Sequence, residues 1–288
     1  MDQRALHILG LLDISPRSIE PVTGGDINDS FRVTDEKWNI YFLKINREGS
    51  PKEIITTEAE GLDMMKELGV EFIPQNYQSA STAETAGLLM PFYESRSPDA
   101  AAWIDFFEAL AQMHLISAEH FGGQDNFIGS IPQDNTHRNN WANFYYDHRL
   151  LPQLEQAVEK GYFTKDEQEI WPLLFHGIAS ICPVEKPSLI HGDLWNGNMI
   201  STSRGILLID PCPHFAHREM DLGMMTLFSG FPVESYIRYY NAVYPLTPQW
   251  EDRMEVYQLY YLLVHLNLFG TAYLPGVKRI IRQLVAFG

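Results

Sequence analysis

Cysteine is scarce in this sequence, with only two residues, Cys182 and Cys212, among 288. Two cysteines cannot form the disulfide framework that stabilises small secreted domains, and both stand in apolar segments. We therefore expect two reduced thiols in the core of a cytoplasmic protein.

Basic residues are also few, and no long apolar run is present. Lys and Arg together number 21 against 37 Asp and Glu, a net charge of −16. Such a field repels nucleic acids and anionic membranes, so neither is an expected partner, and a bound phosphate compound would need a metal ion. The most apolar stretch, residues 257–269, is shorter than the ~20 residues of a membrane span. Residues 1–12 predict a first helix and no signal peptide, so we expect a soluble protein.

The first part of the chain has the pattern of a small sheet with one helix. Apolar and polar residues alternate with period two at 29–34 and again at 39–45, which predicts a hairpin. Two further strands are expected at 76–79 and 87–90. Helical spacing appears at 57–68 and ends at Gly69.

The remainder of the chain is mainly helical. A polar run with two prolines, residues 91–98, is the best candidate for a domain boundary, so we predict an α+β protein with lobes at 1–92 and 93–288. The expected helices are 99–116, 141–160, 165–181, 219–228, 233–243, 249–267 and 277–287, and the expected short strands are 188–191, 199–200 and 206–209.

Polar side chains stand at the ends of two of these short strands. One strand leads into His191-Gly192-Asp193, Asn198 follows five residues after Asp193, and the other strand ends at Asp210. Phosphoryl transfer needs a carboxylate near the attacking hydroxyl and hard oxygen ligands for Mg²⁺. We predict Asp193 as the base and Asn198 with Asp210 as metal ligands. A capped turn and a strand-end aspartate are the purely structural alternative.

Lys44 interrupts an otherwise apolar strand, where an ammonium group costs free energy unless it is paired or faces a wet cleft. Glu58, near the start of the following helix, is its natural partner, with Glu60 as a competitor. Together, Lys44 and Glu58 would hold the α- and β-phosphates of ATP. A plain edge-strand charge for Lys44 and a solvated face for Glu58 are the alternatives.

Gly24, Gly25 and Asp26 stand immediately before the hairpin that carries Lys44. Glycine permits close approach of the backbone, so this loop could cover nucleotide phosphates, although a simple glycine turn explains it as well. Met90 and Phe92, at the end of the last strand before the boundary, complete the candidate nucleotide-binding residues.

Two further residues are expected to support the Asp193 loop. Asp221 follows Arg218-Glu219 at the start of a helix, so it is a helix N-terminal carboxylate that could brace the loop. His191 has the same supporting role. The ten histidines contain no pair at the spacing of a helical zinc motif, and we interpret His114 as a buried, hydrogen-bonded side chain.

Residues 191–198, His-Gly-Asp-Leu-Trp-Asn-Gly-Asn, resemble the motif of the fructosamine (ketosamine) kinase family, in which tryptophan follows the Asp-Leu pair. The family has the protein-kinase-like and aminoglycoside-phosphotransferase-like fold. Supporting segments occur in order along nearly the whole chain, at 24–28, 42–44, 58–62, 141–150, 210–211, 218–222, 228–232 and 265–270.

The resemblance implies a bilobal fold, with a small antiparallel-sheet lobe for the nucleotide at 1–92 and a larger helical lobe for catalysis and the acceptor at 93–288. It also implies ATP with Mg²⁺ and transfer to the 3-hydroxyl of a ketosamine, with Asp193 as base. The acceptor would be a fructosamine- or ribulosamine-type glycated amine, either free or on a lysine of a protein.

Acceptor contacts are expected from Trp195, as a wall of the pocket, and from His265 and Asn267, for which a core-helix role is the alternative. Leu266 and Leu268 stand where some relatives carry an aromatic and a polar residue, which affects the shape of the pocket. Two rival functions remain open. One is an aminoglycoside- or choline-type phosphotransferase of the same fold, and the other is a nucleotide-binding module without catalysis.

Overall fold

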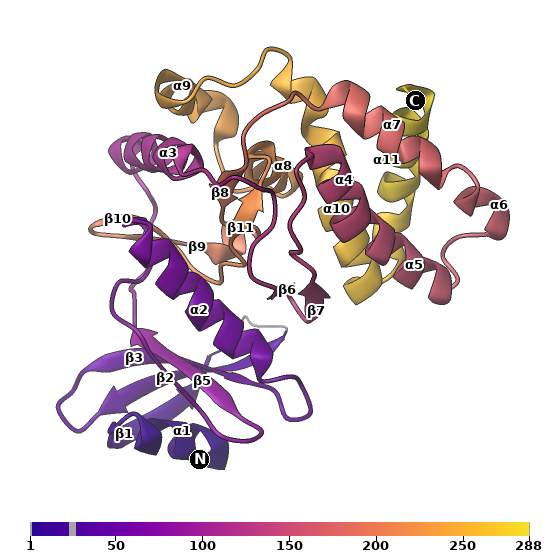
Figure 1. The fold of residues 1–288 in the computed structure, drawn as a ribbon. Helices are drawn as coiled ribbons and strands as arrows, with labels where there is room; N and C mark the ends of the chain where they lie inside the picture. Colours follow the sequence, from indigo (N-terminus) through magenta and orange to yellow (C-terminus); the bar gives the residue numbers. More distant parts are fainter. Residues whose placement is uncertain (1, 23–26, 288) are drawn as a thin grey trace. The chain divides into compact units, whose positions relative to one another are not determined.

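The described residues, 2–22 and 27–287, form two units in this computed structural model (Figure 1). The first unit comprises residues 1–106 and 198–212, and the second comprises 107–197 and 213–288. Each contains its own sheet elements and helices. Within the described ranges, no helix combines the length and the apolar character that crossing a membrane requires.

The first unit is built on an antiparallel sheet with the strand order β1-β2-β3-β5-β4. The pair β2 and β3 is the predicted hairpin, with Phe31 opposite Leu43. Proline stands at both ends of β1, which is tolerated because β1 is an edge strand. The strands are β1 (Pro16–Pro21), β2 (Asn28–Asp35), β3 (Ile40–Asn46), β4 (Gln78–Ser81) and β5 (Ala86–Pro91).

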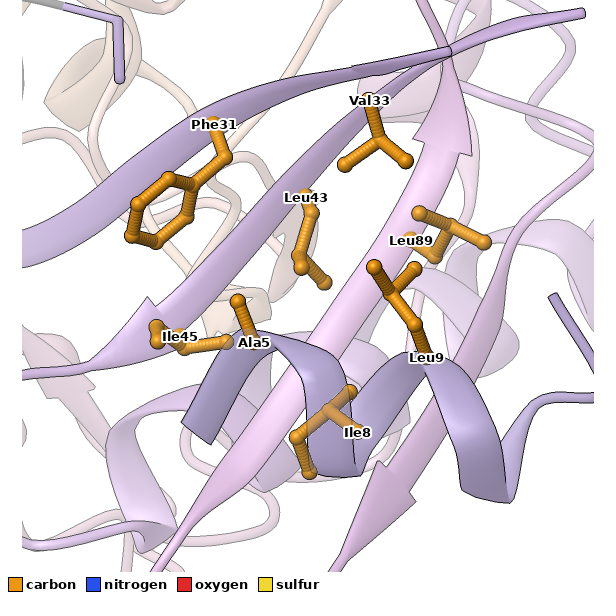
Figure 2. Close-up of a cluster of buried hydrophobic side chains, with 8 residues drawn as sticks. All are labelled: Ala5, Ile8, Leu9, Phe31, Val33, Leu43, Ile45 and Leu89. Carbon is orange, nitrogen blue, oxygen red and sulfur yellow. The ribbon is translucent and has the colours of Figure 1, made fainter. Parts of the chain in front are cut away.

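Helix α1 (Gln3–Leu11) covers one face of this sheet. Asp2 caps the helix by accepting hydrogen bonds from the Arg4 and Ala5 amides. The helix contributes three buried residues at helical spacing, and the strands contribute alternate residues that face it (Figure 2). This apolar cluster contains Ala5, Ile8, Leu9, Phe31, Val33, Leu43, Ile45 and Leu89.

Helix α2 (Glu53–Glu67) lies on the opposite face of the sheet from α1 (Figure 1). It begins four residues before the predicted start at residue 57. Residues 54–57 are all β-branched and have low helix propensity, so the sequence did not indicate that the helix begins before them. Burial of Ile54 and Ile55 outweighs that propensity.

A hairpin from the second half of the sequence also belongs to the first unit. It consists of β9 (Met199–Thr202) and β10 (Gly205–Leu208). The Leu208 amide donates to the Phe72 carbonyl at 2.8 Å, and the Arg96 Nε donates to the Thr202 carbonyl at 2.7 Å. These long-range bonds are why the described units differ from a single division at residue 92. Assignment of the lobes to nucleotide and acceptor stays a prediction.

The second unit is mainly helical, and α10 is its central element, packed against α5, α8 and α11. Helix α3 begins in the first unit and continues into the second. The elements are α3 (Ala100–Leu115), α4 (Trp141–Tyr145), the π-helix η1 (Tyr146–Leu150), α5 (Leu151–Glu159), α6 (Lys165–Gln168), α7 (Trp171–Ile181), the 3₁₀-helix η2 (Asn196–Asn198), α8 (Glu219–Leu227), α9 (Val233–Val243), α10 (Trp250–Phe269), the 3₁₀-helix η3 (Thr271–Tyr273) and α11 (Leu274–Phe287).

Two predicted helices are interrupted, each next to a proline. The segment predicted as one helix at 165–181 is two helices, α6 and α7, and Pro172 stands in the first turn of α7. The predicted helix at 141–160 contains the π-helical turn η1, and Pro152 opens α5. Proline lacks the amide hydrogen that a helix interior needs, so it is accommodated in a first turn.

Short strand pairs complete the second unit and position the Asp193 loop. Strand β8 (Ser188–Ile190) pairs with β11 (His214–Ala216), and β6 (Asn126–Ile128) pairs with β7 (Ile131–Gln133). The sequence pattern predicted β8 from the apolar run that leads into His191, but it did not predict β6, β7 or β11, which have only three residues each and no such run. His191 follows directly on β8.

Candidate active site

Lys44 joins three segments of the first unit. Its Nζ lies 2.7 Å from Glu58 Oε2 on α2 and 2.7 Å from Asp210 Oδ2 after β10. The side chains of Lys44 and Glu58 are only 8% and 7% exposed, whereas that of Asp210 is 35% exposed. Glu60, the competing candidate, lies on the exposed side of α2. The cluster therefore has one carboxylate in the interior and one that solvent or a ligand can reach.

The pKa values in this cluster follow from burial and from the shared ammonium group. Burial alone would lower the pKa of Lys44, but the charges of Asp210 and Glu58 raise it above its ordinary value. Burial raises the pKa of Glu58, and the negative charge of Asp210 acts in the same direction against the attraction of Lys44. Lys44 is thus a fixed cation held between the side chains of Glu58 and Asp210.

Asn198 and Asp210 stand at the open end of the β9–β10 hairpin. Met199 pairs with Leu208, and one step further the Ile209 amide donates to the Asn198 carbonyl at 2.9 Å. Asp210 has a φ of +56°, a left-handed conformation that aspartate tolerates better than most residues. The structure therefore brings these two predicted metal ligands to the same end of one hairpin.

The other candidate nucleotide-binding residues of the first unit lie on or after β5. Met90 pairs with Phe42, and Leu88 pairs with Lys44, so Met90 and Lys44 share one face of the sheet. Phe92 is half-buried, and its amide donates to the Ile40 carbonyl at 3.0 Å. The remaining candidates, Gly24, Gly25 and Asp26, lie outside the described residues.

In the second unit, Asp221 holds the backbone of the loop that follows β8. Its Oδ2 accepts from the His191 amide at 2.7 Å, and its Oδ1 accepts from the Gly192 amide at 3.0 Å. Asp221 is fully buried in the first turn of α8. Burial would raise the pKa of Asp221, but hydrogen bonds from His114 and from the loop amide, with nearby histidine charge, hold it below its ordinary value.

His114 connects Asp221 to a second element of the core. Its Nε2 lies 3.2 Å from Asp221 Oδ2, and its Nδ1 lies 2.8 Å from the Tyr240 hydroxyl. His114 is 1% exposed, as a buried and hydrogen-bonded histidine should be. Its partners come from α8 and α9, which no local pattern in the sequence indicates.

Tyr261 is a contact of the same loop that sequence reasoning missed. Its hydroxyl donates to the Gly192 carbonyl at 3.0 Å, so both backbone groups of Gly192 are hydrogen-bonded. Gly192 has a φ of +87°, which glycine adopts without strain. Tyr261 lies in a helix rich in tyrosine, and no sequence signal separates it from its neighbours.

Asp193 is half-buried and follows this supported backbone. Its amide donates to Nδ1 of His191 at 3.3 Å, and its carbonyl accepts from the Trp195 amide at 3.1 Å. The fully buried ring of His191 therefore makes a hydrogen bond within the loop. Asp221 and Tyr261 hold the backbone that leads into Asp193, and His191 accepts from the Asp193 amide itself.

Trp195 is 41% exposed, a large exposure for an indole ring. The ring lies against Gly197, where an added Cβ would come within 2.2 Å of it. On its other side it meets Phe228 edge to face, with ring centroids 6.3 Å apart. The ring is thus fixed in position while part of its surface remains open.

His265 and Asn267, the other two candidate acceptor contacts, have different surroundings. Asn267 is buried, and its amide nitrogen donates to the backbone and side-chain oxygens of Gln153 at 2.9 Å each. These bonds tie α10 to α5, which is the core-helix role left open for Asn267. His265 packs instead against the ring of Phe228, at 5.0 Å between centroids.

A metal site formed by protein side chains alone needs several ligands close together. The described ranges contain no group of three or more His, Cys, Asp and Glu side chains arranged to hold a metal ion. Mg²⁺ needs fewer protein ligands, because one or two carboxylates suffice when nucleotide phosphates supply other oxygens. The part-exposed carboxylate of Asp210, with Asn198 at the same end of the hairpin, fits this requirement.

Comparison with known proteins agrees with the resemblance in the motif. The family model described as fructosamine kinase matches residues 9–287. A probable ketoamine kinase from Enterococcus faecium is 35% identical over 268 residues, covering 91% of this chain and 94% of the relative. A crystal structure from Thermobifida fusca, of a protein assigned as a fructosamine-3-kinase, has a TM-score of 0.82 at 33% identity, covering 98% of this chain and 97% of that chain.

More distant structures share the fold alone. Aminoglycoside 2′-phosphotransferase IIIa, in its GDP complex, has a TM-score of 0.60 at 14% identity and covers 99% of both chains. The architecture is accordingly that of the protein-kinase-like phosphotransferases, as the sequence predicted. Within that class, the chain belongs to the fructosamine kinase family.

Proposed function

We propose that this protein transfers the γ-phosphoryl group of ATP to a hydroxyl group on the sugar-derived part of a ketosamine. The observation that carries the proposal is the position of Lys44, whose Nζ lies 2.7 Å from both the interior Glu58 and the part-exposed Asp210. A fixed ammonium beside a reachable carboxylate is the arrangement that nucleotide phosphates and a divalent cation require.

In this proposal the first unit binds the nucleotide. Lys44 contacts the α- and β-phosphates, and Glu58 keeps its ammonium group in place. Met90 and Phe92 contact the base, and the loop with Gly24, Gly25 and Asp26 covers the phosphates.

Asn198 and Asp210 are the residues that would hold Mg²⁺, which when bound would neutralise charge on the β- and γ-phosphates. An aspartate and an amide oxygen are hard ligands of the kind that this ion prefers, and the two residues that carry them stand at the same end of one hairpin. The ammonium group of Lys44 balances the negative charge of the Asp210 carboxylate.

Asp193 is the proposed general base. The acceptor hydroxyl gives its proton to the Asp193 carboxylate as its oxygen forms a bond to the γ-phosphorus, and the bond to the β,γ-bridging oxygen breaks to release ADP. Asp193 must be held accurately for this transfer. The backbone bonds of Asp221 and Tyr261 to the loop support that role.

A ketosamine is the proposed acceptor because relatives that match over most of their length are named probable ketoamine kinases. The acceptor is then a small glycated amine or a glycated lysine of a protein. Trp195 packs on its sugar-derived chain, because an aromatic face suits the C–H surface of a sugar.

Turnover of defined acceptors tests the proposal. Purified protein given ATP, Mg²⁺ and either fructosyl-lysine or ribulosyl-lysine should release ADP, with the new phosphate on the sugar-derived chain. Asp193→Asn fills the same space but cannot accept the proton, so kcat should fall by about 10²-fold or more while ATP binding persists. Turnover of an aminoglycoside or of choline, with neither ketosamine accepted, would contradict the ketosamine assignment.

A further inference from the structure

A row of aromatic rings runs from the Asp193 loop along one side of α10 in the second unit. Successive ring centroids lie 6.3 Å apart for Trp195 and Phe228, 5.0 Å for Phe228 and His265, 5.4 Å for His265 and Phe269, and 5.2 Å for His265 and Tyr273. We call these five side chains the aromatic row. Each spacing is within the range of direct ring contact.

The two ends of the aromatic row are open to solvent. Trp195 is 41% exposed at one end and Phe269 is 52% exposed at the other, while His265 between them is half-buried. Exposed apolar rings that adjoin one another leave apolar surface in water, and such surface is typical of a binding site. Trp195 stands two residues after Asp193, so a molecule lying along the row has one end near the proposed base.

His265 adds one directed polar atom to this surface. Its Nδ1 lies 2.7 Å from the Tyr261 carbonyl, which can only accept, so Nδ1 carries the proton. Burial lowers the pKa of His265, which keeps the ring neutral near pH 7. In the neutral ring Nε2 is an acceptor, and no residue in the described part of the chain uses it.

We propose that the aromatic row binds the amine-bearing side of the acceptor, with the protonated amine donating a hydrogen bond to His265 Nε2 and its substituent extending toward Phe269. The inference rests on the proposed function and specifies its substrate class. A ketosamine contains a secondary amine that is cationic near pH 7, directly attached to the sugar-derived chain.

The chemistry of the row selects a cation with an apolar extension. Aromatic faces attract an ammonium group, and a neutral imidazole nitrogen accepts from it. The chain's net charge of −16 also favours a cationic ligand over an anionic one. Because the Phe269 end is exposed, a long substituent can continue past it.

A matched set of acceptors separates these contributions. The set contains fructose carrying methylamine, hexylamine or, in place of the amine, a hexyl ether at the same carbon. For the wild-type protein, KM should be lowest for the hexylamine compound and about five- to tenfold higher for the ether. Phe269→Ala should raise KM for the hexylamine compound about threefold and leave the methylamine compound unchanged.

Two controls make the result specific. Phe287→Ala removes another exposed ring, 65% exposed on α11 of the same unit, and should change neither KM. His265→Leu should raise KM for both amines toward that of the ether, whereas His265→Gln retains an acceptor oxygen and should preserve most of the difference. If the His265 variants fail to fold, the KM values of the wild-type protein and of Phe269→Ala for the three acceptors still test the proposed subsite.

Equal KM values for the amine and the ether in the wild-type protein would overturn the subsite, as would a Phe269→Ala effect on the KM of ATP instead of the acceptor. In both cases ketosamines are still phosphorylated, so the proposed function survives. Failure of the wild-type protein to phosphorylate any ketosamine overturns both proposals.

Discussion

The two units bury carboxylates for different purposes. In the first unit, Glu58 and Asp210 share the ammonium group of Lys44, which is a side chain that can exchange partners for a ligand. In the second unit, Asp221 binds two backbone amides and His114, all of which belong to the buried core and are not accessible to a ligand. The first arrangement suits reversible binding, and the second suits permanent support of a loop. Substitutions in the first unit should therefore weaken ligand binding, whereas substitutions in the second unit should lower stability and kcat.

The largest effect after loss of Asp193 is expected for Asp221→Asn. The amide group presents an N–H₂ to one of the two loop amides, so one buried donor loses its acceptor, at a cost of about 1–3 kcal/mol. Both the thermal midpoint and kcat should fall, while the KM of ATP changes little. Unfolding curves and steady-state kinetics measure this. A normal thermal midpoint with normal kcat would show that the loop does not depend on Asp221.

Asp210→Asn should affect nucleotide binding and leave the fold of the second unit unchanged. The variant loses the formal charge that would face Mg²⁺, so the affinity for ATP with Mg²⁺ should fall about tenfold or more. Titration of ATP with and without Mg²⁺ makes the comparison. An unchanged Mg²⁺ dependence would mean that another carboxylate holds the ion.

Lowering the pH should change the contributions of Asp221 and Glu58 to the free energy of unfolding in opposite directions. The pKa of Asp221 is lowered in the folded protein, so its contribution to stability is present above the unfolded value of about 3.8 and is lost as the pH falls through the folded pKa. The pKa of Glu58 is raised, so its contribution is fully present below its unfolded value and is lost as the pH rises through the folded pKa.

Urea unfolding between pH 6 and pH 3 tests this difference with two variants. The stability gap between the wild type and Asp221→Asn should narrow as the pH falls below about 3.8, because the unfolded wild type then takes up a proton at Asp221 that the folded state does not bind. The gap between the wild type and Glu58→Gln should not narrow over the same range. If the two stability gaps change with pH in the same way, the opposite directions assigned to the pKa values of Asp221 and Glu58 are wrong.

The smallest effect is expected for Tyr261→Phe, which removes one hydroxyl from the loop. Loss of its bond to the Gly192 carbonyl should cost about 0.5–1.5 kcal/mol and lower kcat a few-fold without changing the KM of ATP. Tyr257→Phe is the matched control, because Tyr257 is equally buried one turn earlier on α10 and makes no bond to the loop. Equal kcat values for the two variants would remove Tyr261 from the support of Asp193.

Local pattern sufficed for much of the fold. The alternation at 29–34 and 39–45 predicted the β2–β3 hairpin, and helical spacing predicted α9 with the bounds that the structure has. These features depend on neighbours in sequence, so periodicity reports them directly. Errors arose where a proline or a β-branched run altered the local preference, as at Pro172 and at residues 54–57.

The candidate site divides in the same way. The sequence by itself identified the residue types, because a lysine in an apolar strand and carboxylates at strand ends need a reason to be there, and it indicated Glu58 as the partner of Lys44. Only the tertiary structure decided that Asp210 shares that ammonium group, that Asp221 holds the loop together with Tyr261, and that Asn267 binds Gln153. The partners in these contacts stand 29 to 166 residues apart in the sequence, where no local periodicity connects them and packing alone determines which side chains meet.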